Sequence, residues 1–297
     1  MLLFRASRFL LSVFLLMFSL HLYAAQKSYF LTAPDGTRLA VQEAGDPNGT
    51  PVILIHGLLG SHLNWENQLQ DDQLKHLRLI TYDLRGHGLS GKPEQDSSYR
   101  EGKRWAEDLA TVIEGSHAAR PLLVGWSLGG AVITQYLAAY GDRQIRGAMY
   151  VDGVVELTPV LIPAHPAVYE GMTSAELKTH LNGERDFLRL CFHQQPDSRT
   201  FEQLIASAAM ASWSMQRAVP GMRIPLEQGL GSARVPLLFI YGKYDALVNP
   251  QASLARAKSI NPQIRSLIYA DSGHAPFNEE PSRFNRDLAE FAAQLHY

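Results

Sequence analysis

The stretch Pro121-Leu-Leu-Val-Gly125-Trp126-Ser127-Leu128-Gly129-Gly130 places a serine between two glycines, directly after an apolar run. The apolar run is typical of a strand, and the residues after the serine favour a helix. A strand that turns sharply into a helix leaves no room for Cβ atoms two residues to either side, so glycines are needed there. The serine hydroxyl is then exposed beside the free amides of a helix N-terminus. The pattern predicts that Ser127 is a nucleophile for acyl transfer, although five residues alone could also be a glycine-rich turn with a capping serine.

Apolar runs and helical patterns alternate on both sides of this stretch. Continuous apolar runs predict buried strands, and amphipathic segments between them predict helices. The alternation implies right-handed crossovers and a mostly parallel central sheet flanked by helices, which is an α/β fold. A turn at Asp35-Gly36 predicts that residues 27–44 form an antiparallel hairpin at one edge. The strands are expected at 51–55, 77–82, 122–124, 147–151, 235–241 and 264–269, and the helices at 63–74, 99–114, 128–140 and 280–295.

The alternation stops between residues 154 and 233, where no buried-strand run appears. Thr173-Ser-Ala-Glu176 and Thr200-Phe-Glu-Gln203 both have the spacing of a capping box, so helices are expected to begin there. We therefore expect residues 26–153 and 234–297 to form the α/β core and residues 154–233 to form an inserted helical cap.

Charge and cysteine content exclude several classes of protein. The chain has 297 residues, 46% of them hydrophobic, and a net charge of -2, so it lacks the basic surface of a nucleic-acid-binding protein. Cys191 is the single cysteine, so no intramolecular disulfide can form. Its place inside an apolar helical run disfavours a catalytic thiol. The composition does not indicate an oligomeric state.

The N-terminus resembles an export signal. Arg5 and Arg8 precede an apolar run from Phe9 to Leu20, and Ala24-Ala25 provide a small-residue cleavage site. We expect residues 1–25 to be a signal peptide, and the protein to be periplasmic or secreted in a bacterium. The residue three before the cut is Leu22 or Tyr23, neither of them small, so an uncleaved membrane anchor formed by residues 9–25 is the alternative.

Three residues at the ends of predicted strands have the types that serine catalysis needs. A serine hydroxyl needs a general base within hydrogen-bond reach, and the base needs an acid that fixes its tautomer. Ser127, Asp245 and His274 follow three strands in the order Ser…Asp…His that accompanies a nucleophile elbow. Asp152 also ends a strand next to the elbow and is the alternative acid. We favour Asp245, because its turn begins with Gly242.

These motifs together resemble the α/β-hydrolase fold of the capped, single-domain type. The matching segments are His56-Gly57, Asp83-Leu-Arg-Gly-His-Gly-Leu-Ser90, Gly125-Trp-Ser-Leu-Gly129, Gly242-Lys-Tyr-Asp245 and Ser272-Gly-His-Ala-Pro-Phe277. The resemblance covers nearly everything after the N-terminal signal. It implies a catalytic triad of Ser127, Asp245 and His274, and an oxyanion hole made by the backbone amides of Leu58 and Leu128.

Other conspicuous side chains receive simpler interpretations. His56, His62 and His87 lie on separate turns without a tight ligand spacing, so we expect no metal site. His56 is expected to brace the oxyanion loop, and Asp83, Arg85 and His87 to tie turns together. The substrate-pocket candidates are Trp65, Trp126 and Trp213. For Trp126, packing beneath the active site is the alternative. The cap contains further large apolar residues at helical spacing, most of which are expected to form its own core and a few to line the pocket: Phe187, Leu188, Leu190, Phe192, Leu204, Ile205 and Met210.

The function expected from this sequence is hydrolysis of carboxylic esters of small to medium apolar molecules through an acyl-enzyme on Ser127, without a cofactor. The same triad could serve a lactonase, a cofactor-free perhydrolase of the haloperoxidase kind, an aminopeptidase, a carbon-carbon bond hydrolase or an acyltransferase. Dehalogenases and epoxide hydrolases of this fold need an aspartate nucleophile, and the elbow has none. A ligand-binding protein with an inactive triad is the alternative from another class.

Overall fold

An eight-stranded sheet forms the centre of the protein. The structure is a computed structural model and describes residues 27–295. The hairpin strands and the strands of the main sheet are those expected from the sequence, to within two residues at most ends. Their bounds are β1 (Lys27–Thr32), β2 (Arg38–Gly45), β3 (Thr50–Ile55), β4 (Leu77–Tyr82), β5 (Leu122–Trp126), β6 (Gly147–Val151), β7 (Leu237–Gly242) and β8 (Arg265–Tyr269).

The strand order in the sheet is β1-β2-β4-β3-β5-β6-β7-β8. β1 pairs with β2 and β2 with β4 in antiparallel fashion, whereas all pairs from β4 to β8 are parallel. The expected antiparallel edge hairpin and the α/β fold class are confirmed. Because β3, β5, β6, β7 and β8 run in the same direction, the loops after them meet at one edge of the sheet.

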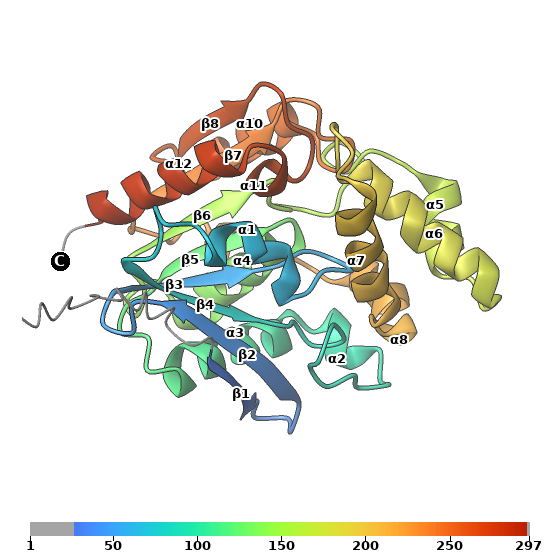
Figure 1. Cartoon of the computed structure of the whole chain (residues 1–297), viewed down its shortest axis with the longest axis horizontal. Coiled ribbons are helices and arrows are strands. Elements are labelled where there is room, and N and C mark those ends of the chain that lie inside the picture. The colour runs from blue at the N-terminus through green and yellow to red at the C-terminus, as the bar shows by residue number, and fades with distance from the viewer. Residues whose placement is uncertain (1–26, 296–297) are drawn as a thin grey trace, which may run out of the picture.

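Helices cover both faces of the sheet. Helices α1 and α12 lie on the face toward the viewer in Figure 1, and α3 and α4 lie behind. All residues of β5, β6 and β7 are buried, as expected for apolar strands that are covered on both faces. The core helices are α1 (Glu66–Leu69), α2 (Ser97–Arg100), α3 (Gly102–Gly115), α4 (Leu128–Tyr140), α10 (Pro250–Ile260), α11 (Pro276–Glu279) and α12 (Pro281–Gln294).

The prediction of one helix at residues 63–74 is wrong. The chain forms only a 3-10 turn, η1 (His62–Trp65), and the single helical turn α1. Asp71 ends the helical path, because its carboxylate accepts a hydrogen bond from the Gln73 amide and its carbonyl accepts one from the Leu74 amide. A side chain that bonds nearby amides in this way competes with helix formation.

Residues 154–233, which we call the cap segment, are helical and contain no strand. They form α5 (Pro166–Met172), α6 (Leu177–Leu190), α7 (Ser198–Ala209), α8 (Trp213–Ala218), the 3-10 turn η2 (Val219–Gly221) and α9 (Leu226–Gly229). Helices α5 to α8 gather beyond one edge of the sheet, at the right of Figure 1.

Two cap helices begin at residues other than those expected. Glu176 caps α6 by accepting from the Lys178 and Thr179 amides, and Asp197 caps α7 by accepting from the Thr200 amide. Thr173 instead ends α5. Carboxylates accept backbone amides at helix starts as hydroxyls do. The cap of α6 is therefore the other end of the first predicted box, and the cap of α7 lies three residues before the second.

No helix among residues 27–295 is long and apolar enough to cross a membrane. The predicted export signal at residues 1–25 lies outside the described residues.

Candidate active site

Ser127 lies at a sharp turn between β5 and α4. It has φ 53° and ψ -114°, a backbone conformation that non-glycine residues seldom adopt. The residue precedes the first turn of α4 and is 7% exposed. Strain of this kind persists where the surrounding structure holds it, commonly at functional sites. The structure thus places Ser127 in the geometry of a nucleophile elbow.

Close packing explains why glycines flank the elbow. A Cβ atom on Gly125 would lie 2.5 Å from the carbonyl carbon and oxygen of Gly129, and one on Gly129 would collide with the carbonyl oxygen of Ile55. β5, the elbow and the first turn of α4 therefore touch through backbone atoms. Any side chain at either glycine would push the turn apart.

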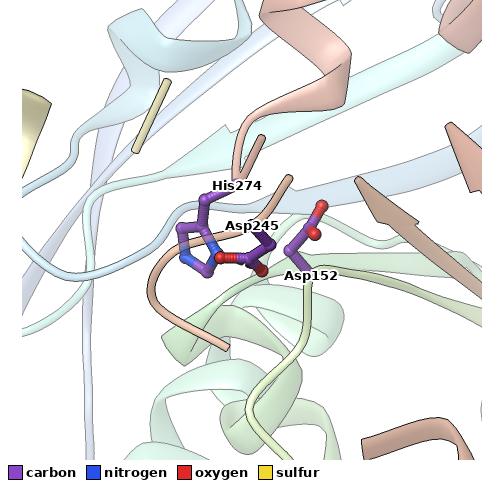
Figure 2. Close-up of side chains that lie close together, drawn as sticks. All are labelled: Asp152, Asp245 and His274. Carbon is purple, nitrogen blue, oxygen red and sulfur yellow. Dashed lines mark hydrogen bonds and ion pairs between the residues drawn. The ribbon is translucent and has the colours of Figure 1, made fainter. Parts of the chain in front are cut away.

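His274 and Asp245 meet on the loops after β8 and β7. The two ring nitrogens of His274 have different surroundings: Nδ1 donates to Asp245 Oδ2 at 2.8 Å, whereas Nε2 is buried without a partner among residues 27–295. The other carboxylate oxygen of Asp245 accepts the amides of Leu247 and Val248. Asp245 therefore fixes the tautomer in which Nε2 is free to accept a proton. Figure 2 shows this pair.

Two contacts hold the histidine loop in place. A Cβ atom on Gly242 would collide with the carbonyl oxygen of Gly273, so the glycine lets the Asp245 and His274 loops touch. Trp126 Nε1 donates to the carbonyl oxygen of His274 at 2.6 Å. Trp126, directly before Ser127, thus binds the backbone of His274.

Asp152, the alternative acid, lies beside Asp245 and does not bond His274. It ends β6 with φ 44°, and its Oδ1 accepts the Gly242 amide at 2.9 Å. Its Oδ2 is buried and has no hydrogen-bond partner within residues 27–295. Burial, and then the charge of Asp245, raise the pKa of Asp152 well above its ordinary value. Asp152 is therefore the protonated member of the two carboxyl groups.

The turn after β3 lies against the nucleophile. A Cβ atom on Gly57 would be 2.9 Å from Ser127 Cβ, so the Leu58 backbone passes close to the serine. Neither the Leu58 nor the Leu128 amide has a hydrogen-bond partner in the described part of the chain. Both amides are thus available to bind an oxyanion next to Ser127.

His56 braces this turn from below, as expected. Its Nδ1 donates to the Gly57 carbonyl at 2.7 Å, and its Nε2 accepts the Leu84 amide at 2.9 Å. Burial lowers the pKa of His56 to about 4, so its ring is neutral. Both nitrogens are occupied, which leaves none for a metal ion.

The segment after β4 is structural, as expected. Arg85 donates to both oxygens of Asp108, at 2.7 and 2.6 Å, and Asp83 accepts the amides of His62 and Leu89. His87 is fully buried, and burial lowers its pKa to about 3. Within residues 27–295, one group of histidine, cysteine and acidic side chains lies close enough together to share a metal ion: Asp152, Asp245 and His274. All three side chains already take part in the hydrogen bonds described above.

A cavity of about 400 Å³ opens beside the nucleophile and the two free amides. Its wall is nearly all apolar and comes mainly from the cap segment. Ser127, Leu58 and Leu128 lie at its floor, and the contributors from the cap include Leu157, Ile162, Met172, Phe187, Val219 and Met222. Such a wall suits an apolar acyl or alcohol group.

The three pocket tryptophans lie elsewhere, which corrects that expectation. Trp65 is fully buried against Phe277, with ring centroids 4.5 Å apart. Trp126 packs against His274 and Phe277, in agreement with the alternative prediction that this residue packs beneath the active site. Trp213 stacks on His180 within the cap segment. None of the three lines the cavity, because each ring is turned to a neighbouring element.

Most of the cap's large apolar residues also lie outside this wall. Of the cap residues named above, Phe187 lines the cavity, in agreement with the expectation that only a few do, and Leu204 borders a separate polar cavity of about 380 Å³. Cys191 is buried, and burial together with nearby carboxylates raises the pKa of its thiol, which disfavours a reactive thiolate.

Glu279 is a residue that the sequence analysis missed. Its Oε1 accepts the Gly273 amide at 2.8 Å, and its Oε2 accepts the amides of His193 and Gln194 at 2.9 and 2.8 Å. One carboxylate therefore joins the loop that carries His274 to the cap segment. The available signal was weak: an acidic residue five positions after His274.

Comparison with known proteins agrees with this geometry. The family described as alpha/beta hydrolase fold matches residues 50–281. A crystal structure from Burkholderia cenocepacia, provisionally described as an aryl esterase, is 65% identical with a TM-score of 0.90, and the alignment covers 91% of this chain and 99% of that one. An esterase from Rhodococcus sp. ECU1013 is 26% identical with a TM-score of 0.83, at coverages of 91% and 99%. A non-heme haloperoxidase of Rhodococcus erythropolis is 25% identical over 88% of this chain and 98% of its own.

Proposed function

Because the chain belongs to the α/β-hydrolase family, we propose that it hydrolyses carboxylic esters of small to medium apolar molecules through an acyl-enzyme on Ser127. The observation that carries the proposal is the 2.8 Å hydrogen bond between His274 Nδ1 and Asp245 Oδ2. This bond leaves His274 Nε2 without a partner in residues 27–295, so that this nitrogen can accept the proton of Ser127. The esterases among the similar structures support the same reaction class.

The proposed reaction has two halves. His274 Nε2 takes the proton of Ser127 as Oγ attacks the ester carbonyl, and the Leu58 and Leu128 amides stabilise the oxyanion. His274 then protonates the departing alcohol. In the second half, His274 activates a water that attacks the acyl-enzyme, and the acid leaves. Asp245 stabilises the imidazolium in both halves. Each amide donor is worth about 3 kcal/mol of barrier.

The cavity supports a small to medium apolar substrate. Its volume of about 400 Å³ is within the range for small-molecule sites, and its wall contains no charged side chain. A substrate that carries a charge near the scissile bond would lose hydration without gaining a partner. We therefore propose neutral esters as substrates, and no nucleic-acid partner.

Ester turnover with matched serine variants tests the proposal. Purified protein should release p-nitrophenol from acetyl, butanoyl and hexanoyl esters, and Ser127→Ala should abolish the release. Ser198→Ala, which changes an exposed serine at the start of α7, should leave it intact. A fluorophosphonate should label Ser127 and no other residue. Absence of labelling at Ser127 in folded protein would refute the serine mechanism.

A second candidate is cofactor-free perhydrolysis, and the similar haloperoxidase favours it. In that case hydrogen peroxide replaces water in the second half, and the peracid that leaves oxidises halide. Monochlorodimedone halogenation that needs both acetate and peroxide, and is lost in Ser127→Ala, would support this activity. Halogenation that persists in Ser127→Ala would contradict it.

For localisation, we propose export across the inner membrane of a bacterium, with anchoring by residues 9–25 as the alternative. The support is the arginine-flanked apolar run of the N-terminus. Fractionation of cells that express the full chain, followed by N-terminal sequencing, separates the two: a mature N-terminus near residue 25 indicates cleavage, and an intact chain in the membrane fraction indicates an anchor.

A further inference from the structure

The backbone of His274 is held at two points, one on either side of its side chain. On the carbonyl side, Trp126 Nε1 donates to the His274 carbonyl oxygen at 2.6 Å. On the amide side, the neighbouring Gly273 amide donates to Glu279 Oε1 at 2.8 Å. Trp126 ends β5 at the centre of the sheet and is buried, so the first point is fixed by the core. The second point is only as fixed as Glu279.

Glu279 is itself held by the cap segment. Its second carboxylate oxygen, Oε2, accepts the amides of His193 and Gln194, which we call the cap loop, at 2.9 and 2.8 Å. The cap loop follows α6, the helix that carries Phe187 in the wall of the Ser127 cavity. Glu279 therefore links the histidine loop to a segment that continues from the cavity wall.

The cap loop also packs directly on the loops after β7 and β8. The His193 ring stacks on Tyr244, directly before Asp245, with ring centroids 4.0 Å apart. A Cβ atom on Gly273 would lie 2.6 Å from the His193 amide nitrogen, so no side chain separates the cap loop from the histidine loop. Close-packed contacts of this kind transmit displacements. A shift of the cap loop would therefore be passed to both loops.

We propose that Glu279 is a positioning residue, and that it makes the placement of His274 against Ser127 depend on the docked cap loop. The inference rests on the proposed esterase function, in which His274 Nε2 takes the proton of Ser127. Proton transfer needs the two heavy atoms about 3 Å apart, and a displacement of about 1 Å can lower the rate by about 10²-fold. Glu279 borders the polar cavity of about 380 Å³ and lies outside the wall of the Ser127 cavity. Its loss should therefore slow the chemical step without weakening substrate binding.

Glu279→Gln tests the positioning role. A glutamine has the same size but one acceptor oxygen, so it cannot accept the amides on both sides. We expect kcat for p-nitrophenyl butanoate to fall by about 10- to 100-fold, with KM changed by less than about threefold. Glu290→Gln, which changes an exposed carboxylate of α12, is the matched control and should keep both constants. An unchanged kcat in folded Glu279→Gln, or a loss confined to KM, would overturn the assignment.

Two variants of Gln194 show whether the cap loop acts through Glu279. Gln194→Pro removes one of the two cap-loop amides and should lower kcat by about three- to tenfold. Gln194→Ala keeps the amide and should lose less than Gln194→Pro. In Glu279→Gln/Gln194→Pro the two losses should not multiply, because Glu279→Gln has already broken the link. Losses that multiply, or equal losses in Gln194→Ala and Gln194→Pro, would show that the cap loop does not act through Glu279.

Crystal structures keep this test apart from that of the esterase function. In Glu279→Gln the His274 ring should lie farther from Ser127 Oγ than in the wild type by about 1 Å, whereas Glu290→Gln should superimpose on the wild type. A His274 ring that keeps its place in Glu279→Gln would overturn the positioning role whether or not the wild type hydrolyses esters. Absence of ester turnover in the wild type, with the displacement present in Glu279→Gln, would refute only the proposed function.

Discussion

Asp152 and Asp245 place two carboxyl groups side by side at the ends of the paired strands β6 and β7. The hydrogen bonds divide their roles. Asp245 accepts the His274 ring and two backbone amides, whereas Asp152 accepts the Gly242 amide. Burial and then the neighbouring Asp245 raise the pKa of Asp152, so Asp152 is the carboxyl group that resists ionisation.

This division predicts opposite kinetic outcomes for two asparagine variants. Asp245→Asn should lower kcat by about 10³- to 10⁴-fold, because the amide stabilises neither the tautomer nor the imidazolium. Asp152→Asn should leave kcat almost unchanged, since an amide resembles the neutral carboxyl that is present. Steady-state turnover of p-nitrophenyl butanoate measures both. A large loss in Asp152→Asn with little loss in Asp245→Asn would identify Asp152 as the acid.

The raised pKa of Asp152 also predicts how stability depends on pH. The unfolded chain loses this proton near pH 4, whereas the native protein keeps it to higher pH. The native state then binds more protons, so Asp152 contributes stability at low pH that is lost as pH rises. Asp152→Asn should therefore stabilise the protein more at pH 8 than at pH 4.5. Thermal unfolding measures the difference, with Asp72→Asn, whose side chain is 93% exposed, as control. A gain that does not grow with pH would contradict the assignment of the proton.

The turn after β3, which carries the Leu58 amide next to Ser127, predicts different kinetic effects for two substitutions of Leu58. Leu58→Pro removes the free amide, and the preceding Gly57 has no Cβ to clash with the ring. We expect kcat to fall by about 10²- to 10³-fold. Leu58→Ala keeps the amide and should lower kcat by less than about tenfold, because only the side chain's apolar contact with the substrate is lost. The unfolding temperature of each variant should be measured as well, so that a loss of kcat is not confused with a loss of folded protein. Full activity in a folded Leu58→Pro would exclude this amide from the oxyanion hole.

The buried histidines predict sensitivity to acid. His56 and His87 have pKa values of about 4 and about 3, against about 6.5 in the unfolded chain. Below pH 6.5 the unfolded chain binds protons that the native protein does not, so stability falls as pH falls. His87→Phe should reduce the loss in unfolding free energy between pH 7 and pH 5 by about 2 kcal/mol. Denaturant titrations at both pH values measure the unfolding free energy. If His87→Phe loses as much stability between pH 7 and pH 5 as the wild type, the His87 ring is charged in the native state.

The sequence predicted the sheet, and the contact between Asp245 and His274, for one physical reason. A strand buried on both faces must be a continuous apolar run, and parallel strands bring their following loops to one edge. Asp245 and His274 each follow such a run, on neighbouring strands, so their contact could be expected. The short helical turn at Glu66–Leu69 could not, because it depends on how Asp71 bonds its neighbours.

The pocket was harder to predict because lining depends on which way a side chain turns. Trp65 packs on Phe277 and Trp213 on His180, contacts between segments far apart in the chain. Hydrophobic spacing shows that a residue is buried, not what buries it. The cavity wall also contains Gln216, whose partner Glu184 lies 32 positions earlier on another helix, a contact that spacing does not indicate.

The contact of Glu279 with the cap segment bears on how this enzyme could be altered by exchange of that segment. Glu279 binds the cap through the main-chain amides of His193 and Gln194, which every residue except proline supplies. Cap sequences of other composition could therefore be grafted onto the core without loss of this anchor, provided that the loop keeps its length and two consecutive non-proline residues. The choice of substrate would then change with the cap, while Glu279 keeps the His274 loop in its position relative to Ser127.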